Sequence, residues 1–122
     1  PEFMGVEILS IEEGKMTSRL SIKPHHIAPN GFLHAATVIA LADTTCGYAS
    51  FAHLPEGAES LCTIELKSNH LGTAREGAIF CVATAVHLGR NTQVWDAEVS
   101  DEKTGKVIAL FRCTQMNFFP KK

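Results

Sequence analysis

Hydrophobic residues follow two different spacings along this chain of 122 residues. Between Gly5 and Ile22, apolar and polar residues alternate on both sides of the turn Glu12-Glu13-Gly14-Lys15, which predicts a hairpin of two short strands. The same alternation returns in four longer segments: Ser60–His70, Gly77–His87, Thr92–Asp101 and Lys106–Asn117. Turn-forming residues join these four strands by short connections, which predicts antiparallel neighbours.

The segment between the two groups of strands has the character of a helix. From His34 to about Phe51 it is rich in Ala, Leu and Ile, and it stops near Pro55. Before it, Pro24 and Pro29 bracket an irregular loop, because each proline removes a backbone donor and biases the preceding residue away from the helix. The predicted order is β-β-α-β-β-β-β, an α+β fold in which a long antiparallel sheet curls around one apolar helix and buries its face.

Composition limits the class of protein. We expect a single domain over residues 4–122, since Pro1-Glu2-Phe3 resemble a cloning remnant before Met4. The net charge of -2, with scattered Lys and Arg, offers no basic stripe for nucleic acid. The longest apolar run, Ala35 to Ala42, is too short to span a bilayer, and no signal peptide is evident. We therefore expect a cytoplasmic protein that binds neither nucleic acid nor membrane.

Cysteine and histidine residues show no disulfide or metal-binding pattern. Four cysteines without a CxxC pair stand in apolar surroundings, which is typical of reduced core thiols: Cys46, Cys62, Cys81 and Cys113. The histidines His25-His26 and His34 lack cysteine or carboxylate companions at ligand spacing. We therefore expect no metal site and interpret His25-His26 as polar loop residues near the mouth of the functional site.

A single carboxylate, Asp43, interrupts the middle of the apolar helix. Removing a carboxylate from water costs several kcal/mol unless it is paired or used. One interpretation is that Asp43 lies at an edge of the helix or pairs with an arginine. Its small neighbours favour a different one, a pocket around the carboxylate, because they let a ligand approach closely: Ala40, Ala42, Cys46 and Gly47.

The spacing between His34 and Asp43 predicts a dimer. Nine helical residues rotate by about 900° and rise about 13 Å, so the two side chains cannot meet within one chain. A two-fold axis that sets two such helices side by side would bring His34 of the partner subunit to Asp43 and create two equal composite sites.

The start of the same helix supplies backbone donors. Its first N–H groups are unpaired and carry the positive end of the helix dipole, so the amides near Ala35 can receive a carbonyl oxygen that becomes negative. Gly31 permits a tight turn just before them. A carboxylate opposite such donors suits acyl transfer, with Asp43 attacking the acyl carbon or taking a proton from water.

Two phrases of the chain resemble a known family. PNGFLHAATVIALADTTCGYA is similar to the helix signature of hotdog-fold acyl-CoA thioesterases, and NHLGTAREGAIFCVATAVHLGRNTQVWDAEVSDEKTGK resembles the branch with the enterobactin proofreading and dihydroxynaphthoyl-CoA thioesterases. The resemblance implies a hotdog fold and homodimers with sites at the interface, assembled as a dimer of dimers into homotetramers. It also implies an acyl-CoA substrate and no cofactor, since coenzyme A is part of the substrate.

The resemblance further implies roles for individual residues. Asp43 falls on the catalytic carboxylate of the family, His34 on the histidine beside the thioester carbonyl, and the Ala35 amide on the backbone donor. His70 falls on a strand histidine that lines the acyl site. Thr63 lies where some members place a hydroxyl that orients water.

The resemblance also implies a contact with coenzyme A, and several positions of this chain differ from the family's pattern. The turn Gly89-Arg90-Asn91 matches a segment near the nucleotide, where Arg90 is expected to contact a phosphate. Ala28 replaces a Gln or Asn that polarises the carbonyl, and Asn30 is a candidate substitute. Ala35-Ala36 replace the usual Gly-Gly, and Gly47 stands where a Ser or Thr often helps to hold water. The predicted substrate-binding set is Asn30, Gly31, Gly47, Thr63, His70, Gly89, Arg90 and Asn91.

Three functions are compatible with this pattern. Hydrolysis of an acyl-CoA thioester is preferred, because Asp43 is expected to face helix-start amides. A hydratase or dehydratase is less favoured, since the His-containing loop of those hotdog relatives is not found. A non-catalytic acyl-CoA-binding dimer would explain the departures at Ala28, Ala35-Ala36 and Gly47 as traces of a lost activity.

Overall fold

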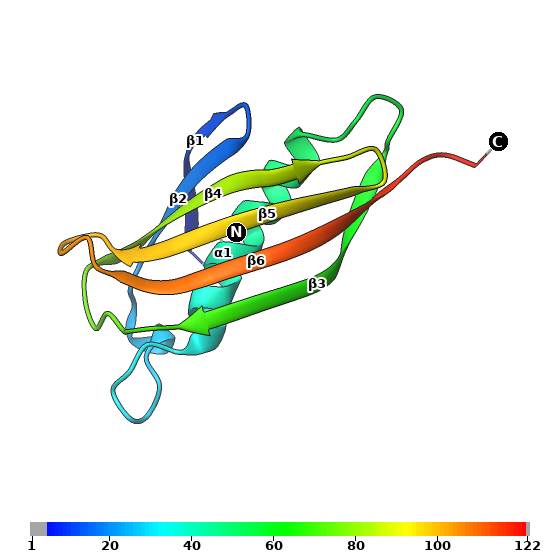
Figure 1. The fold of residues 1–122 in the computed structure, drawn as a ribbon. Helices are drawn as coiled ribbons and strands as arrows, with labels where there is room; N and C mark the ends of the chain where they lie inside the picture. The colour runs from blue at the N-terminus through cyan, green and yellow to red at the C-terminus, as the bar shows by residue number, and fades with distance from the viewer. Residues whose placement is uncertain (1–4, 122) are drawn as a thin grey trace.

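Residues 5–121 are described by a computed structural model with one long helix and six strands (Figure 1). The predicted order β-β-α-β-β-β-β is confirmed, and each long element begins and ends within one residue of its expected bounds. A short 3-10 turn, η1, was not predicted. The elements are β1 (Val6–Glu12), β2 (Lys15–Ser21), η1 (Pro24–His26), α1 (Ala35–Ala52), β3 (Ser60–His70), β4 (Ala78–Leu88), β5 (Thr92–Asp101) and β6 (Val107–Phe118).

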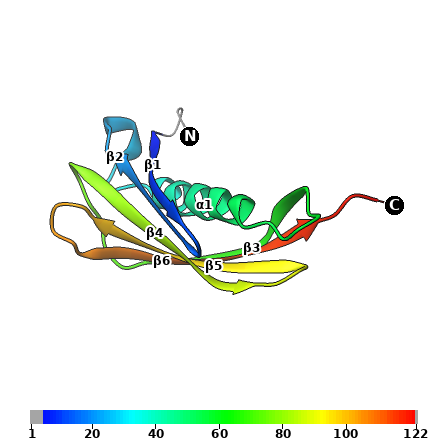
Figure 2. The same cartoon turned by 90° about the horizontal axis from the view of Figure 1, so that it is seen from above.

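The strands form one antiparallel sheet in the order β1-β2-β4-β5-β6-β3. It curves, and α1 lies on its concave face, as the view from above shows (Figure 2). Strands β1 and β3 are the two edges of this sheet. The sheet therefore has one face that packs on the helix and one that faces away from it.

The prediction that consecutive strands are neighbours is wrong for β3 and β4. Strand β3 pairs with β6, from Ser60↔Phe118 to His70↔Ala109, whereas β4 pairs with β2 and β5. The connection over residues 71–77 must pass two strands, a distance of roughly 14 Å at the usual strand spacing. Seven extended residues reach about 23 Å, so this connection can span the two strands. A short connection therefore limits how far apart two consecutive strands lie, but it does not determine which strand each one pairs with.

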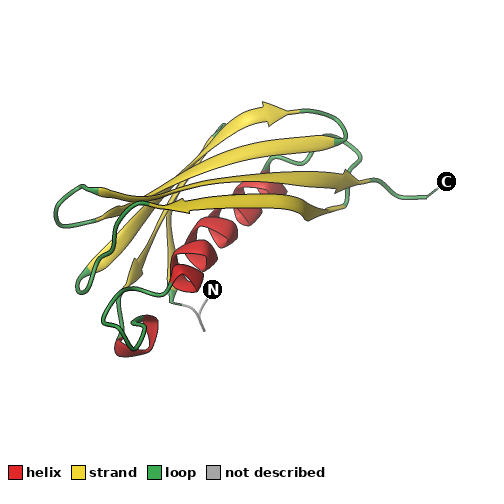
Figure 3. Cartoon of the chain, turned by 60° about the horizontal axis from the view of Figure 1, so that its bottom comes forward, coloured by secondary structure: helices red, strands yellow, loops and turns green. Residues whose placement is uncertain are grey.

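One side of α1 forms the core with the concave face of the sheet (Figure 3). We call it the covered side; its residues include Leu41, Thr45, Cys46 and Ala49, all with no exposed surface. Leu41, Cys46 and Ala49 belong to the same buried hydrophobic cluster as Trp95, which lies on β5. Burying one such leucine contributes roughly 2 kcal/mol, so packing on this side holds the helix in place.

The opposite side of α1 is not covered. We call it the open side; it comprises Ala36, Ala40, Gly47 and Phe51, with the half-buried Asp43 at its border. Phe51 keeps 61% of its surface exposed. The sheet therefore buries one face of the apolar helix, as predicted, and leaves this side open.

Three further expectations have mixed outcomes. Cys46, Cys81 and Cys113 are free and buried, as predicted, but Cys62 is exposed because it lies on the edge strand β3. His26 is buried rather than part of a polar mouth, and its Nδ1 accepts the Lys23 N–H at 2.9 Å. Within residues 5–121, no helix has the length and apolar character needed to cross a membrane.

Candidate active site

The loop before α1 is a tight hairpin. The Gly31 N–H donates to the Ala28 carbonyl at 2.9 Å. Gly31 has a φ of +84°, a left-handed backbone conformation that residues other than glycine rarely adopt. The exposed Asn30 uses its Oδ1 to accept the Phe32 N–H at 3.1 Å. The predicted turn at Gly31 is present, and one oxygen of Asn30 helps to shape the loop.

Exposed residues with backbone N–H groups stand at the start of α1. The carbonyl of His34 accepts the N–H groups of Thr37 and Val38 at 3.0 and 3.3 Å. The N–H groups of Ala35 and Ala36 precede these bonds, in the part of a helix that has no intrahelical acceptor. His34, Ala35 and Ala36 are all exposed. A polar group of a ligand can therefore reach the positive end of α1.

Asp43 is half-buried in the middle of α1, and its Oδ1 is buried with no hydrogen-bond partner within residues 5–121. Loss of solvent raises the pKa of this carboxyl group. No ion pair of the described chain includes it, so the arginine partner considered above is absent there. An ionised oxygen without a partner is costly in folding and suited to accept a proton or attack carbon.

The surroundings of Asp43 are apolar and small. Asp43 lies close enough to Cys46 and Cys113 for its charge to disfavour their thiolates. Because Cys113 belongs to β6, the carboxylate is near that strand. One helical turn further on, Gly47 has no atom within 4 Å of where a Cβ would stand. The carboxylate therefore borders open space on the side of the helix that the sheet leaves uncovered.

His34 and Asp43 do not meet within the chain. His34 is the N-cap of α1 and Asp43 lies in its interior, so nine residues separate them by about 13 Å along the helix axis. His70 ends β3, and its Nε2 lies 3.1 Å from the Ser68 hydroxyl. On the same strand, the Thr63 hydroxyl donates to Gln115 Oε1 at 2.8 Å.

The turn predicted to contact the nucleotide joins β4 and β5. The Gly89 N–H donates to the Thr92 carbonyl at 2.9 Å, and the Arg90 guanidinium lies 4.2 Å from the centre of the Phe119 ring. This turn lies at the C-terminal end of α1, together with the start of β3, whereas the end of β3 lies at the N-terminal end (Figures 1 and 2). Within one chain, the predicted residues of the loops and of β3 thus fall into two groups at opposite ends of the helix, with Asp43 between them.

Three buried amide side chains near these groups were not predicted: Gln93, Gln115 and Asn117. They stand at strand positions whose side chains point toward α1, in register with buried Cys113 and Trp95. A polar residue on the inward phase of an alternating strand is the signal that identifies them in the sequence.

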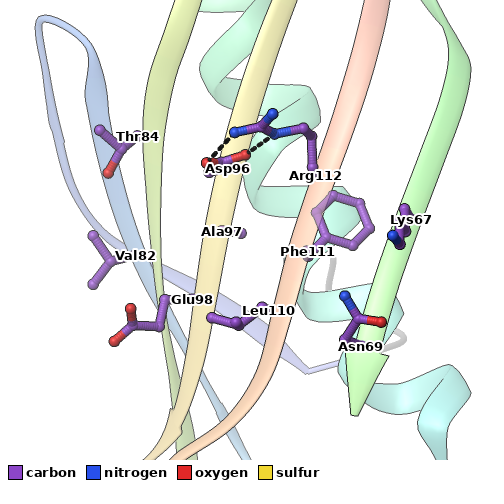
Figure 4. Close-up of a pocket in the computed structure, with 10 residues that line it drawn as sticks. All are labelled: Lys67, Asn69, Val82, Thr84, Asp96, Ala97, Glu98, Leu110, Phe111 and Arg112. Atoms are coloured by element: carbon purple, nitrogen blue, oxygen red, sulfur yellow. Dashed lines mark hydrogen bonds and ion pairs between the residues drawn. The ribbon is translucent and has the colours of Figure 1, made fainter. Parts of the chain in front are cut away.

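A separate hollow lies on the other face of the sheet (Figure 4). Its lining includes the pair formed by Arg112 and Asp96, joined at 2.5 and 2.9 Å, together with Lys67 and Glu98. The strands stand between this hollow and α1, and it contains no residue of the predicted site. We therefore locate the candidate active site on the helix side.

A curved antiparallel sheet around one long helix is the hotdog architecture. The unpaired carboxylate oxygen of Asp43 suits a hydrolase. The thioesterase superfamily profile matches residues 30–108. Over 113 residues the chain is 33% identical to 1,4-dihydroxy-2-naphthoyl-CoA hydrolase of Listeria monocytogenes, covering 93% of this chain and 90% of the relative. The chain therefore belongs to the thioesterase superfamily, and the prediction of a thioester hydrolase is confirmed.

Solved structures agree with this assignment. A mutant thioesterase from Pseudomonas aeruginosa superposes with a TM-score of 0.90 at 28% identity, covering 98% of this chain and 85% of that one. A thioesterase from Haemophilus influenzae has a TM-score of 0.88 at 29% identity, covering 97% and 81%. The hotdog fold predicted from the sequence is confirmed.

Proposed function

We propose that this chain hydrolyses an acyl-CoA thioester to a free acid and coenzyme A at two composite sites of a homodimer. In each site, Asp43 acts as nucleophile or general base. The thioester carbonyl is held by the Ala35 amide and by His34 of the partner subunit. The observation that carries this proposal is the buried, unpaired Oδ1 of Asp43 beside the open side of α1.

The chemistry follows from the charges at the two ends of the site. As a nucleophile, Asp43 would bond to the acyl carbon and expel the coenzyme A thiolate, and water would then hydrolyse the mixed anhydride. As a base, it would take a proton from the water that attacks the same carbon. In both routes the carbonyl oxygen becomes negative, and unpaired N–H groups at a helix start stabilise that charge.

Several features support a dimer. Strand β3 is an edge strand of 11 residues, bonded to β6 on one side only, and its Ile64 and Leu66 expose 52% and 43% of their surface. The open side of α1 lies next to this edge. Pairing of two β3 edges about a two-fold axis would cover these surfaces and set the two helices antiparallel, which joins the two separated groups of site residues.

The name of the Listeria relative guides the choice of substrate. That protein is named for an aromatic acyl-CoA, 1,4-dihydroxy-2-naphthoyl-CoA. An aromatic acyl-CoA therefore belongs first in a panel that also contains branched and medium-chain acyl groups. The acyl group with the highest kcat/KM in that panel is the preferred substrate.

The first test measures release of free thiol from the acyl-CoA panel. We expect Asp43→Asn to lower kcat by about 10²–10⁴-fold, because it removes the base or nucleophile while keeping the shape of the side chain. His25→Ala, which changes an exposed histidine of the preceding loop, serves as the control and should retain activity. Unchanged turnover in Asp43→Asn would exclude the mechanism.

The second test asks whether the sites are composite. Asp43→Asn and His34→Ala are each expected to be inactive as homodimers. After the two are unfolded together and refolded at equal amounts, about half of the dimers should be mixed, each with one intact site, which restores about a quarter of wild-type activity. A site built within one chain would give no recovery.

A further inference from the structure

Two buried amide side chains connect α1 to the turn at residues 89–91. Gln93 has no exposed surface, and Asn117 exposes 5%. The Gln93 Oε1 accepts the Trp95 indole N–H at 2.9 Å, while its Nε2 donates to the Ser50 carbonyl and to Asn117 Oδ1, both at 3.0 Å. The C-terminal part of α1 is thereby bonded to β5 and β6 through a single amide.

Asn117 passes this connection on to the turn. Its Nδ2 donates to the carbonyls of Gly89 and Arg90 at 3.3 and 3.0 Å, and its backbone N–H donates to the Asn91 carbonyl at 2.8 Å. Three successive carbonyls of the turn are thus held by one residue. The side-chain amides of Gln93 and Asn117 have partners on every polar atom, and a fully satisfied buried network of this kind is rigid.

The turn held in this way presents one cation. Arg90 is exposed, and the central carbon of its guanidinium lies over the Phe119 ring, 4.2 Å from the ring centre. Stacking on an aromatic ring orders a guanidinium while leaving its N–H groups free for an anion. The bond from Asn117 Nδ2 to the Arg90 carbonyl and the ring contact on the guanidinium together hold Arg90 at its backbone and at the tip of its side chain.

We propose that Gln93 and Asn117 are positioning residues that hold Arg90 to receive a phosphate of the nucleotide end of coenzyme A. The inference rests on the proposed function for its ligand. It gives a functional reason for the buried amides of Gln93 and Asn117, which catalysis at Asp43 does not require. Because Gln93 also bonds to the carbonyl of Ser50, the same network sets the distance between the phosphate site and the helix that carries Asp43.

The test compares coenzyme A with pantetheine, which shares its thiol arm but has no phosphate. Binding of each is measured by calorimetry, so that the result does not depend on turnover. We expect Asn117→Ala to weaken coenzyme A binding by about tenfold or more and to leave pantetheine binding unchanged, because a misplaced Arg90 loses a charge-assisted bond. Arg90→Ala should reproduce this pattern, and the double variant should add little to it.

Controls separate positioning from general destabilisation. Ser18→Ala removes another fully buried polar group far from the turn and should change neither affinity. The ratio of the two dissociation constants cancels any loss of folded protein, and Asn117→Thr provides a second, bulkier replacement. In turnover, Asn117→Ala should raise KM for an acyl-CoA with kcat nearly unchanged.

Two results would overturn the inference: equal binding of coenzyme A and pantetheine by the wild type, or an equal loss for both ligands in Asn117→Ala. Failure of the proposed function is recognised separately, by unchanged thiol release in Asp43→Asn. The two ideas can therefore fail independently.

Discussion

The covered and open sides of α1 treat polar groups in opposite ways. On the covered side, the Thr45 hydroxyl donates to the Leu41 carbonyl at 2.7 Å and lies 2.6 Å from the Ser18 hydroxyl, so both are satisfied. At the border of the open side, Asp43 keeps a buried oxygen without a partner in the described chain. One helix thus carries a side optimised for stability and a side that keeps an unmet bonding capacity for a ligand.

The largest effect is expected where packing is complete. Leu41→Ala removes a side chain with no exposed surface and should lower the free energy of unfolding by about 2–5 kcal/mol. Chemical denaturation monitored by the fluorescence of Trp95 measures this change. A loss below about 1 kcal/mol would show that the covered side is not the main source of stability.

Breaking a satisfied polar pair should cost less. Thr45→Val removes a hydroxyl that must accept from Ser18, because Thr45 itself donates to Leu41, and it leaves the Ser18 donor buried without a partner. We expect a loss of about 1–3 kcal/mol, most of which the double variant Ser18→Ala/Thr45→Val should recover. Strictly additive losses in the denaturation cycle would contradict the pairing.

A substitution on the open side should separate stability from activity. Gly47→Ala adds a methyl group into open space and removes a flexible glycine from a helix, so it should stabilise the chain by up to about 1 kcal/mol. If the site lies here, thiol release from acyl-CoA should fall in the same variant. Gains in both stability and turnover would place the ligand elsewhere.

The smallest effect concerns the charge of Asp43. Burial raises its pKa in the folded chain, so ionisation destabilises the fold as the pH rises from the ordinary aspartate pKa through the raised value. Asp43→Asn does not titrate and should be more stable near neutral pH by about 0.5–1 kcal/mol, allowing for solvent screening. Thermal unfolding should show this gain vanish below about pH 3.9, where the wild-type carboxyl is also neutral.

Local patterns were sufficient to predict the elements of this fold. Alternation located β3 and β5 at their observed bounds, and the alanine-rich run located α1, because each pattern reflects the period of its own backbone. The partner of β3 was not predictable in this way. Pairing with β6 depends on where the rest of the chain goes, and the connection over residues 71–77 permits more than one neighbour.

The candidate site was predicted in part. A lone carboxylate in an apolar helix pointed to Asp43, and helix geometry showed that His34 could not reach it in the same chain. The buried amides of Gln93 and Asn117 escaped notice, because a polar residue in a strand reads as outward-facing until its register is known. The exposure of Cys62 was missed for the related reason that nothing local marks β3 as an edge.

The long edge of β3 has a consequence for the handling of this protein. An extended strand with free N–H and C=O groups and exposed Ile64 and Leu66 is a template on which foreign strands can grow into aggregates. Pairing of β3 with β3 of the partner subunit would occupy these free N–H and C=O groups. In the proposed dimer, the contact that completes the active site would also protect the chain from misassembly, so selection for catalysis and selection for solubility would act on the same strand.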